Sequence, residues 1–183
     1  METLEAIARR KSVRSYKQEQ VSEEAMATII KAGLSAPYAG PFQVSVVQKP
    51  ALLKRLSEAT LTAMKNSSNE FLRERASVAG YDPLYGAPTV VLITAPADSR
   101  NGAANAALAA ENMILAATDL GLGTCYMGSP ASGLGGEQGP ELAAEIGIPA
   151  GYTVRSSVAI GYPAAGETFA PPKREGGKVN FVK

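Results

Sequence analysis

The order of secondary-structure signals along this sequence predicts an α+β protein whose helices and sheet form three layers. Segments with helical periodicity alternate with short, partly apolar segments that are typical of strands. The regular strand–helix–strand rhythm of a dinucleotide-binding domain is missing, and no Gly-x-Gly-x-x-Gly follows a first strand. The length of 183 residues, with 45% hydrophobic residues, predicts a single domain over residues 1–183, with or without a short swapped arm.

The first half of the chain predicts several helices and one strand. Residues 3–10 have the spacing of a short helix. Ser22 is followed by two acidic residues and then by apolar residues at helical spacing, so we expect it to cap a helix that ends before Pro37. Residues 44–47 are β-rich and predict a strand, whereas residues 51–79 contain one or two helices.

The second half contains two long apolar segments. Residues 88–94 are continuously apolar, as expected for a strand that is buried on both faces. Residues 102–120 are mostly alanine and are apolar on almost every side, which predicts a helix that is buried on most sides and is ended by Gly121. Weaker signals predict a strand at 124–127, a helix at 142–146 and a strand at 152–160.

Charge and cysteine content limit the partners and the compartment. Basic and acidic side chains nearly balance, 18 against 17, which gives no electrostatic reason to expect nucleic acid or an anionic membrane as a partner. The single cysteine, Cys125, excludes an intrachain disulfide and suits a reducing compartment. The first residues lack the pattern of a signal peptide, and residues 103–120 are too polar to span a bilayer, so we expect a cytoplasmic protein.

The chain contains no histidine. Ser-His-Asp and Cys-His catalysis are therefore excluded, and so is any histidine-ligated metal. Any chemistry must use other side chains or a bound cofactor.

A basic segment near the start of the chain is suited to an anion. Arg10, Lys11 and Arg14 place three cations within five residues, and Ser12 adds a short hydroxyl donor. Arginine can hold a phosphate through two hydrogen bonds, and lysine adds a point charge. The alternative is a solvated basic helix end, because cations are favourable at a helix C-terminus.

Five stretches spread over almost the whole chain match one known family in sequence and in order. They are the basic segment 10–14; Ala-Pro-Tyr-Ala-Gly-Pro-Phe-Gln at 36–43; Tyr-Gly-Ala-Pro at 85–88; the helix at 105–120 with Gly-Leu-Gly-Thr-Cys-Tyr-Met-Gly at 121–128; and Ile-Gly-Tyr-Pro at 160–163, followed by Lys173 and Arg174. Together these stretches resemble the FMN-dependent nitroreductase family.

The resemblance implies a three-layer nitroreductase-like fold with a central, mostly antiparallel sheet flanked by helices. It also implies a homodimer that binds FMN and is reduced by NADH or NADPH. Hydride would pass through the flavin N5, in a ping-pong cycle, to a small electron-poor acceptor such as a nitroaromatic, a quinone or an activated alkene. Two other functions stay open: a non-catalytic flavin-binding or carrier protein, and specialised flavin chemistry such as dehalogenation or flavin breakdown.

The resemblance assigns the cofactor-binding residues and implies no catalytic side chain, because the flavin carries the chemistry. Four cations would meet the FMN phosphate, with Ser12 near the phosphate or the ribityl chain: Arg10, Lys11, Lys173 and Arg174. Arg14 would approach the pyrimidine end of the isoalloxazine and stabilise the negative charge of the reduced ring.

Two further groups of residues would surround the isoalloxazine. Four residues would line the flavin from the partner subunit: Pro37, Tyr38, Ala39 and Gly40. Three others would pass near the reactive edge, where a backbone N–H could bond the flavin N5: Met127, Gly128 and Ser129.

The chain departs from the family pattern in the loop at 36–43. Pro41 stands where the family has asparagine, and proline offers the flavin neither a side-chain donor nor a backbone N–H. A second polar contact normally comes from the middle of the chain, and the candidates are Lys65, Asn66 and Asn69.

Several other residues attract attention. We interpret Cys125 as a small buried strand residue rather than a redox thiol. We interpret three residues before the Gly-Ala-Pro turn as turn and packing residues, with a place at the border of the pocket as the alternative: Tyr81, Asp82 and Tyr85. Glu111 and Asn112 interrupt the alanine-rich helix, and we expect a hydrogen bond across a dimer there. Residues 133–136 are expected to form a mobile loop rather than a phosphate loop.

Overall fold

The computed structural model describes residues 2–166 and 176–183. The elements in chain order are α1 (Thr3–Arg9), α2 (Glu23–Leu34), β1 (Gln43–Val47), α3 (Pro50–Lys65), α4 (Glu70–Ser77), β2 (Thr89–Pro96), α5 (Gly102–Asp119), β3 (Gly123–Met127), α6 (Pro130–Leu134), α7 (Gly139–Ile146) and β4 (Tyr152–Gly161). Each of the helices and strands that the sequence predicts is present, with small differences at the ends.

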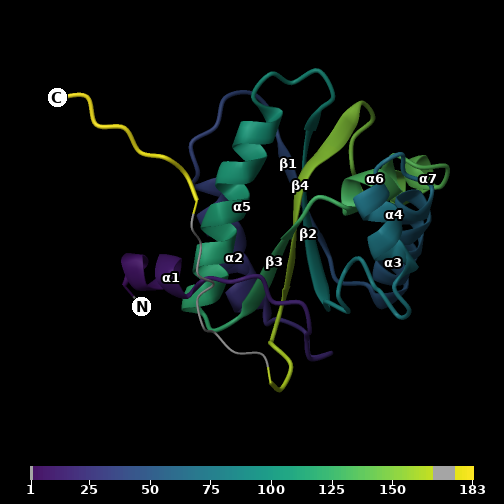
Figure 1. The fold of residues 1–183 in the computed structure, drawn as a ribbon, viewed down its shortest axis with the longest axis horizontal. Coiled ribbons are helices and arrows are strands. Elements are labelled where there is room, and N and C mark those ends of the chain that lie inside the picture. The colour runs from purple at the N-terminus through teal and green to yellow at the C-terminus, as the bar shows by residue number, and fades with distance from the viewer. Residues whose placement is uncertain (1, 167–175) are drawn as a thin grey trace.

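A four-stranded antiparallel sheet forms the middle of three layers (Figure 1). The strand order is β1-β2-β4-β3. Helices α1, α2 and α5 lie on one side of the sheet, and α3, α4, α6 and α7 lie on the other (Figure 1). The α+β class and the antiparallel sheet are therefore confirmed.

Strand β2 is central and is covered on both faces. Its side chains are buried from Thr89 to Ala95, as its continuous apolar sequence predicts. Val91 lies opposite Val46 of β1 and Val158 of β4, and the register with β4 shifts once, between Ile93 and Thr94. Two apolar cores result, one against α2 and α5 and the other against α3 and α7.

Two helix ends follow the local sequence signals. The Ser22 hydroxyl accepts a hydrogen bond from the N–H of Ala25 at 3.2 Å and so caps α2, as expected. Gly121 adopts a left-handed φ of 75° after α5, and its N–H donates to the Thr118 carbonyl at 3.1 Å. The next N–H, of Leu122, donates to Ala117 at 2.8 Å, which completes a Schellman ending.

Helix α5 is buried on only part of its surface in a single chain. The sheet and α2 cover one side, and several residues on the remaining surface are exposed: Ala103, Ala104, Ala107, Leu108 and Glu111. Leu108 is 46% exposed, and on the neighbouring helix α1 the side chains of Leu4 and Ile7 are 79% and 50% exposed. The expectation that this helix is buried on most sides is thus not met within one chain.

The expectation of a mobile loop at 133–136 is wrong for its first two residues, which belong to α6. Gly133 is buried within α6 and packs against the α3 backbone at Thr60. A Cβ on Gly133 would lie 2.7 Å from the Thr60 backbone nitrogen, so the glycine permits the close approach of the two helices.

Across the described ranges 2–166 and 176–183, none of the helices combines the length and apolar character needed to cross a membrane.

Candidate functional site

The basic segment that follows α1 is attached to the edge strand β3. Ser12 forms a parallel bridge with Thr124, and the N–H of Val13 donates to the Thr124 carbonyl at 2.8 Å. Val13 is buried against Gly123, where an added Cβ would lie 2.9 Å from Val13 Cγ1. Helix α1 ends at Arg9, the next three residues are half-buried, and Arg14 is exposed.

Positive charge from two parts of the chain acts on the Cys125 thiol of β3. Burial raises the pKa of the Cys125 thiol, whereas the charges of Arg14, Arg75 and Arg10 and a hydrogen bond with Ser12 lower it. Cations from the N-terminal segment and from α4 therefore lie near one buried sulfur atom. The interpretation of Cys125 as a buried strand residue is confirmed.

Arg75 is a candidate site residue that the sequence reasoning missed. Its Nε donates to the Tyr81 hydroxyl at 3.0 Å, and its Nη2 donates to the Tyr85 hydroxyl at 2.9 Å. The hydrogen bond to Tyr81 is the main cause that raises the Arg75 pKa, and burial raises the pKa of Tyr81 itself. The Tyr85 ring also lies beneath Arg14, whose Cζ is 5.8 Å from the ring centroid. The only sequence signal was the aromatic pair before the Gly-Ala-Pro turn.

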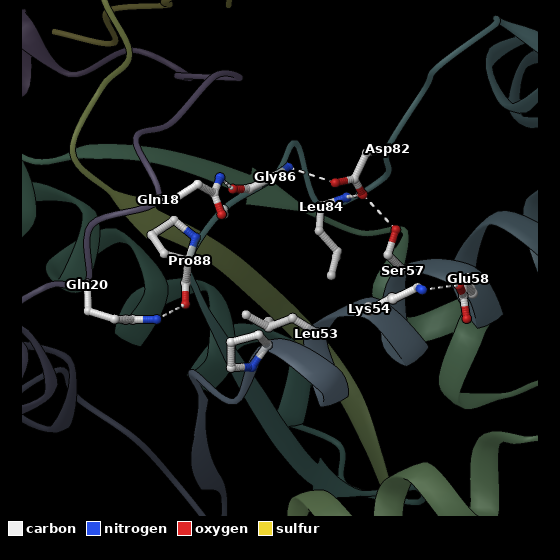
Figure 2. Close-up of a pocket in the computed structure, with 12 residues that line it drawn as sticks. Gln18, Gln20, Leu53, Lys54, Ser57, Glu58, Asp82, Leu84, Gly86 and Pro88 are labelled. Atoms are coloured by element: carbon white, nitrogen blue, oxygen red, sulfur yellow. Dashed lines mark hydrogen bonds and ion pairs between the residues drawn. The ribbon is translucent and has the colours of Figure 1, made fainter.

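Asp82 fixes the turn that carries Tyr85. Its carboxylate accepts hydrogen bonds from the backbone N–H groups of Leu84 and Gly86, at 2.8 and 2.7 Å, and from the Ser57 hydroxyl at 2.6 Å. Figure 2 shows this group beside a cavity of about 400 Å³. None of the predicted cofactor-binding residues that the structure describes lines this cavity. The interpretation of Asp82 as a turn residue is confirmed.

The loop after α2 is exposed but fastened to α5. All four residues from Pro37 to Gly40 are exposed, and Tyr38 packs edge-on against Phe42 with the ring centroids 5.3 Å apart. The side chain of Asn105, on α5, makes two hydrogen bonds with the backbone of Ala39, at 3.1 and 2.9 Å. Asn105 is a second positioning residue that sequence reasoning missed, because its partner is 66 residues away.

Pro41, which stands where the family has asparagine, is exposed. Gln43, two residues further along, makes its side-chain hydrogen bonds within the chain. Gln43 Nε2 donates to the Gly147 carbonyl at 2.7 Å and to the Ser45 hydroxyl at 3.1 Å. The glutamine thus anchors β1 to the turn after α7.

Strand β3 connects two of the predicted groups of site residues, the basic segment 10–14 and the residues 127–129. Met127 ends the strand that holds Ser12, and its carbonyl accepts a hydrogen bond from the Ser157 hydroxyl at 2.7 Å. Gly128 is exposed, and no atom lies within 4 Å of the Cβ position it leaves vacant. Ser129 is half-buried and immediately precedes α6.

The third predicted group, the loop 37–40, lies at the opposite end of α5 from the basic segment (Figure 1). Asn105 holds the loop 37–40 near the start of α5, whereas the basic segment joins the strand that follows the end of α5 (Figure 1). The 18 residues of α5 span about 27 Å at about 1.5 Å per residue. A single chain therefore does not bring the loop 37–40 together with Arg10–Arg14.

The remaining candidates have varied positions. Lys173 and Arg174 lie outside the described residues. Asn66 follows α3 and Asn69 precedes α4, and neither caps a helix with its side chain. Asn112 Nδ2 donates to the Ala32 carbonyl at 3.1 Å within the chain, and the expected hydrogen bond across a dimer stays a prediction for Glu111 and Asn112. Within the described ranges, no group of acidic or cysteine residues is arranged to hold a metal ion.

Comparison with known proteins places the chain in a family. The family model described as Nitroreductase family matches residues 7–162. A protein of Archaeoglobus fulgidus that carries the name NADH dehydrogenase/NAD(P)H nitroreductase is 33% identical over 173 residues, which cover 92% of this chain and 89% of that protein.

Solved structures agree with this assignment. A nitroreductase with bound FMN from Bacteroides fragilis is similar over 100% of both chains, with a TM-score of 0.90 and 29% identity. A nitroreductase with bound FMN from Desulfitobacterium hafniense is also similar over 100% of both chains, with a TM-score of 0.89 and 25% identity. The chain described here therefore belongs to the nitroreductase family.

Proposed function

We propose that this chain is an FMN-dependent NAD(P)H oxidoreductase that acts as a homodimer, with each protomer forming one domain. The observation that carries the proposal is that Arg14 and Arg75 meet at the ring of Tyr85, next to a basic segment that is bridged to β3, in a family whose similar members bind FMN. Edge strand β3 holds the basic segment through the Ser12–Thr124 bridge, and the Met127 carbonyl at its end accepts a hydrogen bond from Ser157.

The donor set fits a phosphorylated, electron-accepting ring. Arg10 and Lys11 are half-buried and follow directly after α1, where they can meet a phosphate, and Ser12 adds a hydroxyl. Arg14 and Arg75 offer positive charge farther along, both close to the ring of Tyr85. The open space at Gly128 leaves the backbone accessible at the end of β3.

Bound FMN would supply a two-electron carrier, with hydride arriving at N5 from NADH or NADPH and leaving to a nitroaromatic, quinone or activated alkene in a ping-pong cycle. The chain's own residues hold and polarise that group. Arg14 and Arg75 keep fixed positive charge beside it, which favours its reduced, negatively charged form. Since the flavin needs no side-chain acid or base to accept hydride, the lack of histidine is consistent with this role.

A homodimer explains why the predicted residues are divided. If two copies pack their α5 helices in opposite directions around a two-fold axis, the loop 37–40 of each comes near the basic segment of the other. The exposed alanines of α5 permit a close approach, and Leu4, Ile7 and Leu108 provide apolar side chains for the contact.

Anaerobic spectroscopy tests the proposed function. The purified protein is expected to show the absorbance band of oxidised flavin, to lose it when NADH or NADPH is added, and to regain it when a nitroaromatic or quinone follows. A flavin that neither nucleotide reduces would identify a carrier protein instead. A flavin that is reduced but is not reoxidised by these acceptors would identify specialised chemistry on the same fold. Absence of any bound or bindable FMN would refute the proposal.

A further inference from the structure

Tyr85 has an unusual backbone conformation. Among the residues that the structure describes, it is the one non-glycine residue with a positive φ, 58°. Side chains rarely adopt this region unless the surroundings impose it, and asparagine or glycine would fit with less strain. A tyrosine at such a position suggests that its side chain has a task of its own.

The turn around Tyr85 is fixed from several directions. The N–H of Tyr85 donates to the Asp82 carbonyl at 3.0 Å, and the Asp82 carboxylate accepts from the N–H groups on both sides of Tyr85, at Leu84 and Gly86 (Figure 2). Gln18 Nε2 donates to the Gly86 carbonyl at 3.1 Å and joins the turn to the N-terminal segment. These bonds set the direction in which the Tyr85 ring leaves the backbone.

The ring of Tyr85 contacts two guanidinium groups from different parts of the chain. Arg14 Cζ lies 5.8 Å from the ring centroid and Arg75 Cζ lies 6.0 Å from it. The Tyr85 hydroxyl also accepts a hydrogen bond from Arg75 Nη2 at 2.9 Å. Two like charges repel each other, and the electron-rich ring and hydroxyl oxygen offset that repulsion.

Tyr81 also holds the Arg75 side chain in position. Its hydroxyl accepts from Arg75 Nε at 3.0 Å, and its ring centroid lies 5.2 Å from Arg75 Cζ. Within the described part of the chain no carboxylate pairs with Arg75, so its side-chain hydrogen bonds end on the two tyrosine hydroxyls. The positive charge of Arg75 is therefore held in place without being neutralised.

We propose that Tyr85 is a positioning residue that holds Arg14 and Arg75 together as one cationic group, which binds the reduced, anionic state of the flavin more tightly than the oxidised state. The inference rests on the proposed function, because it concerns the same site. The ring of Tyr85 positions Arg14, and its hydroxyl positions Arg75. Tyr81 positions Arg75 alone.

Cys125 provides a reporter that needs neither flavin nor activity. It is the only cysteine, so ¹³C-labelled cysteine gives a single side-chain signal in the full-length protein stripped of cofactor. The charges of Arg14, Arg75 and Arg10 and the Ser12 hydrogen bond all lower the pKa of this thiol against the effect of burial. The thiol pKa therefore responds to the positions of the arginines as well as to burial.

The titration compares three variants with a control. Tyr85→Leu removes the ring and the hydroxyl and should raise the Cys125 pKa most. Tyr85→Phe keeps the ring, and Tyr81→Phe removes only the other hydroxyl, so each should raise it less. Phe71→Leu removes an aromatic ring that is 62% exposed on the same helix as Arg75 and should leave it unchanged. An unchanged pKa in Tyr85→Leu, or an equal shift in all four variants, overturns the positioning role.

The flavin itself gives the second readout. We expect Tyr85→Leu to bind oxidised FMN within about threefold of the wild type and reduced FMN about tenfold more weakly. A tenfold selective loss lowers the two-electron midpoint potential by about 30 mV. The midpoint potential of Tyr85→Phe should lie between those of the wild type and Tyr85→Leu. If Tyr85 only shaped the turn, its replacement would weaken the binding of oxidised and reduced FMN equally. That result would overturn the proposal.

The two readouts separate the possible failures. If the wild-type chain binds no FMN, the proposed function fails, and the Cys125 titration still decides whether Tyr85 positions the arginines. If Tyr85→Leu does not fold, as judged by circular dichroism, Tyr85→Gly suits the positive φ and removes the same contacts.

Discussion

The carboxamide of Asn105 pairs with the backbone of Ala39 through both of its ends. Its Oδ1 accepts from the Ala39 N–H at 3.1 Å, and its Nδ2 donates to the Ala39 carbonyl at 2.9 Å. Asn105 is buried and belongs to the long helix α5, whereas Ala39 belongs to the exposed loop after α2. One side chain thus holds the loop 37–40 in a fixed position relative to the helix that we propose as the centre of a dimer.

Replacing Asn105 should therefore loosen the loop. Asn105→Ala leaves the Ala39 N–H and carbonyl without these partners, and we expect it to lower the free energy of unfolding by about 1–3 kcal/mol and to weaken FMN binding. Urea unfolding and a fluorescence titration with FMN measure the two effects. Asn101→Ala is the matched control, because Asn101 is exposed at the start of the same helix and makes no capping hydrogen bond. Equal effects of both substitutions would exclude a special role for Asn105.

A charge on the exposed face of α5 should separate the proposed dimer. Leu108→Glu would bury an unpaired carboxylate between the subunits, which costs several kcal/mol and should weaken dimerisation at least about 100-fold. Light scattering during gel filtration measures the mass. Phe71→Glu, on the other side of the sheet, introduces the same charge at a side chain that is 62% exposed and should leave the mass unchanged. A Leu108→Glu protein with wild-type mass would place the interface elsewhere.

The two arginines of the basic segment should differ in their effects. Arg10→Ala removes a predicted phosphate contact and should weaken FMN binding about 10- to 100-fold, since hydrogen bonds to charged groups contribute about 1.5–3 kcal/mol. Arg14→Ala should slow flavin reduction by NADH or NADPH more than it weakens binding. Equilibrium titration and stopped-flow reduction separate the two quantities. Indistinguishable profiles for the two variants would show that the assigned roles are wrong.

Burial of Cys125 should make the protein less stable in alkali. Burial raises the pKa of its thiol above the ordinary value of 9.0, so the unfolded chain loses this proton at a lower pH than the folded chain. The contribution to stability is complete below about pH 9 and is lost as the pH rises toward the folded pKa, with a slope of at most about 1.4 kcal/mol per pH unit. Urea unfolding between pH 7 and 11 should show a steeper decline for the wild type than for Cys125→Ala. Parallel declines would mean that the thiol titrates alike in both states.

Local patterns predicted the elements because local forces dominate there. Ser22 caps α2 through a residue three positions away, and Gly121 ends α5 by adopting a conformation that is easy for glycine. The buried strand β2 was visible as an unbroken apolar run. Gly133 was misread, because the reason for that glycine is the α3 backbone at Thr60, far away in the sequence.

The site was only partly predictable for the same reason. The basic segment was found because its charges are adjacent in the sequence, and it is fixed to β3. Arg75, Tyr85 and Asn105 act through partners that only folding brings near, so no spacing rule marks them. The hydrogen bond from Asn112 to the Ala32 carbonyl of the same chain was likewise not predictable, because it depends on how α2 packs against α5.

The sequence by itself determined the α+β class, the positions of the helices and strands other than α6, and a cationic segment suited to a phosphate, because each depends on the chemistry of neighbouring residues. Only the tertiary structure decided that Arg14 and Arg75 share the ring of Tyr85, and that the loop 37–40 lies at the far end of α5 from them. Distances between separate elements depend on how the layers pack, and a linear pattern does not encode that packing residue by residue.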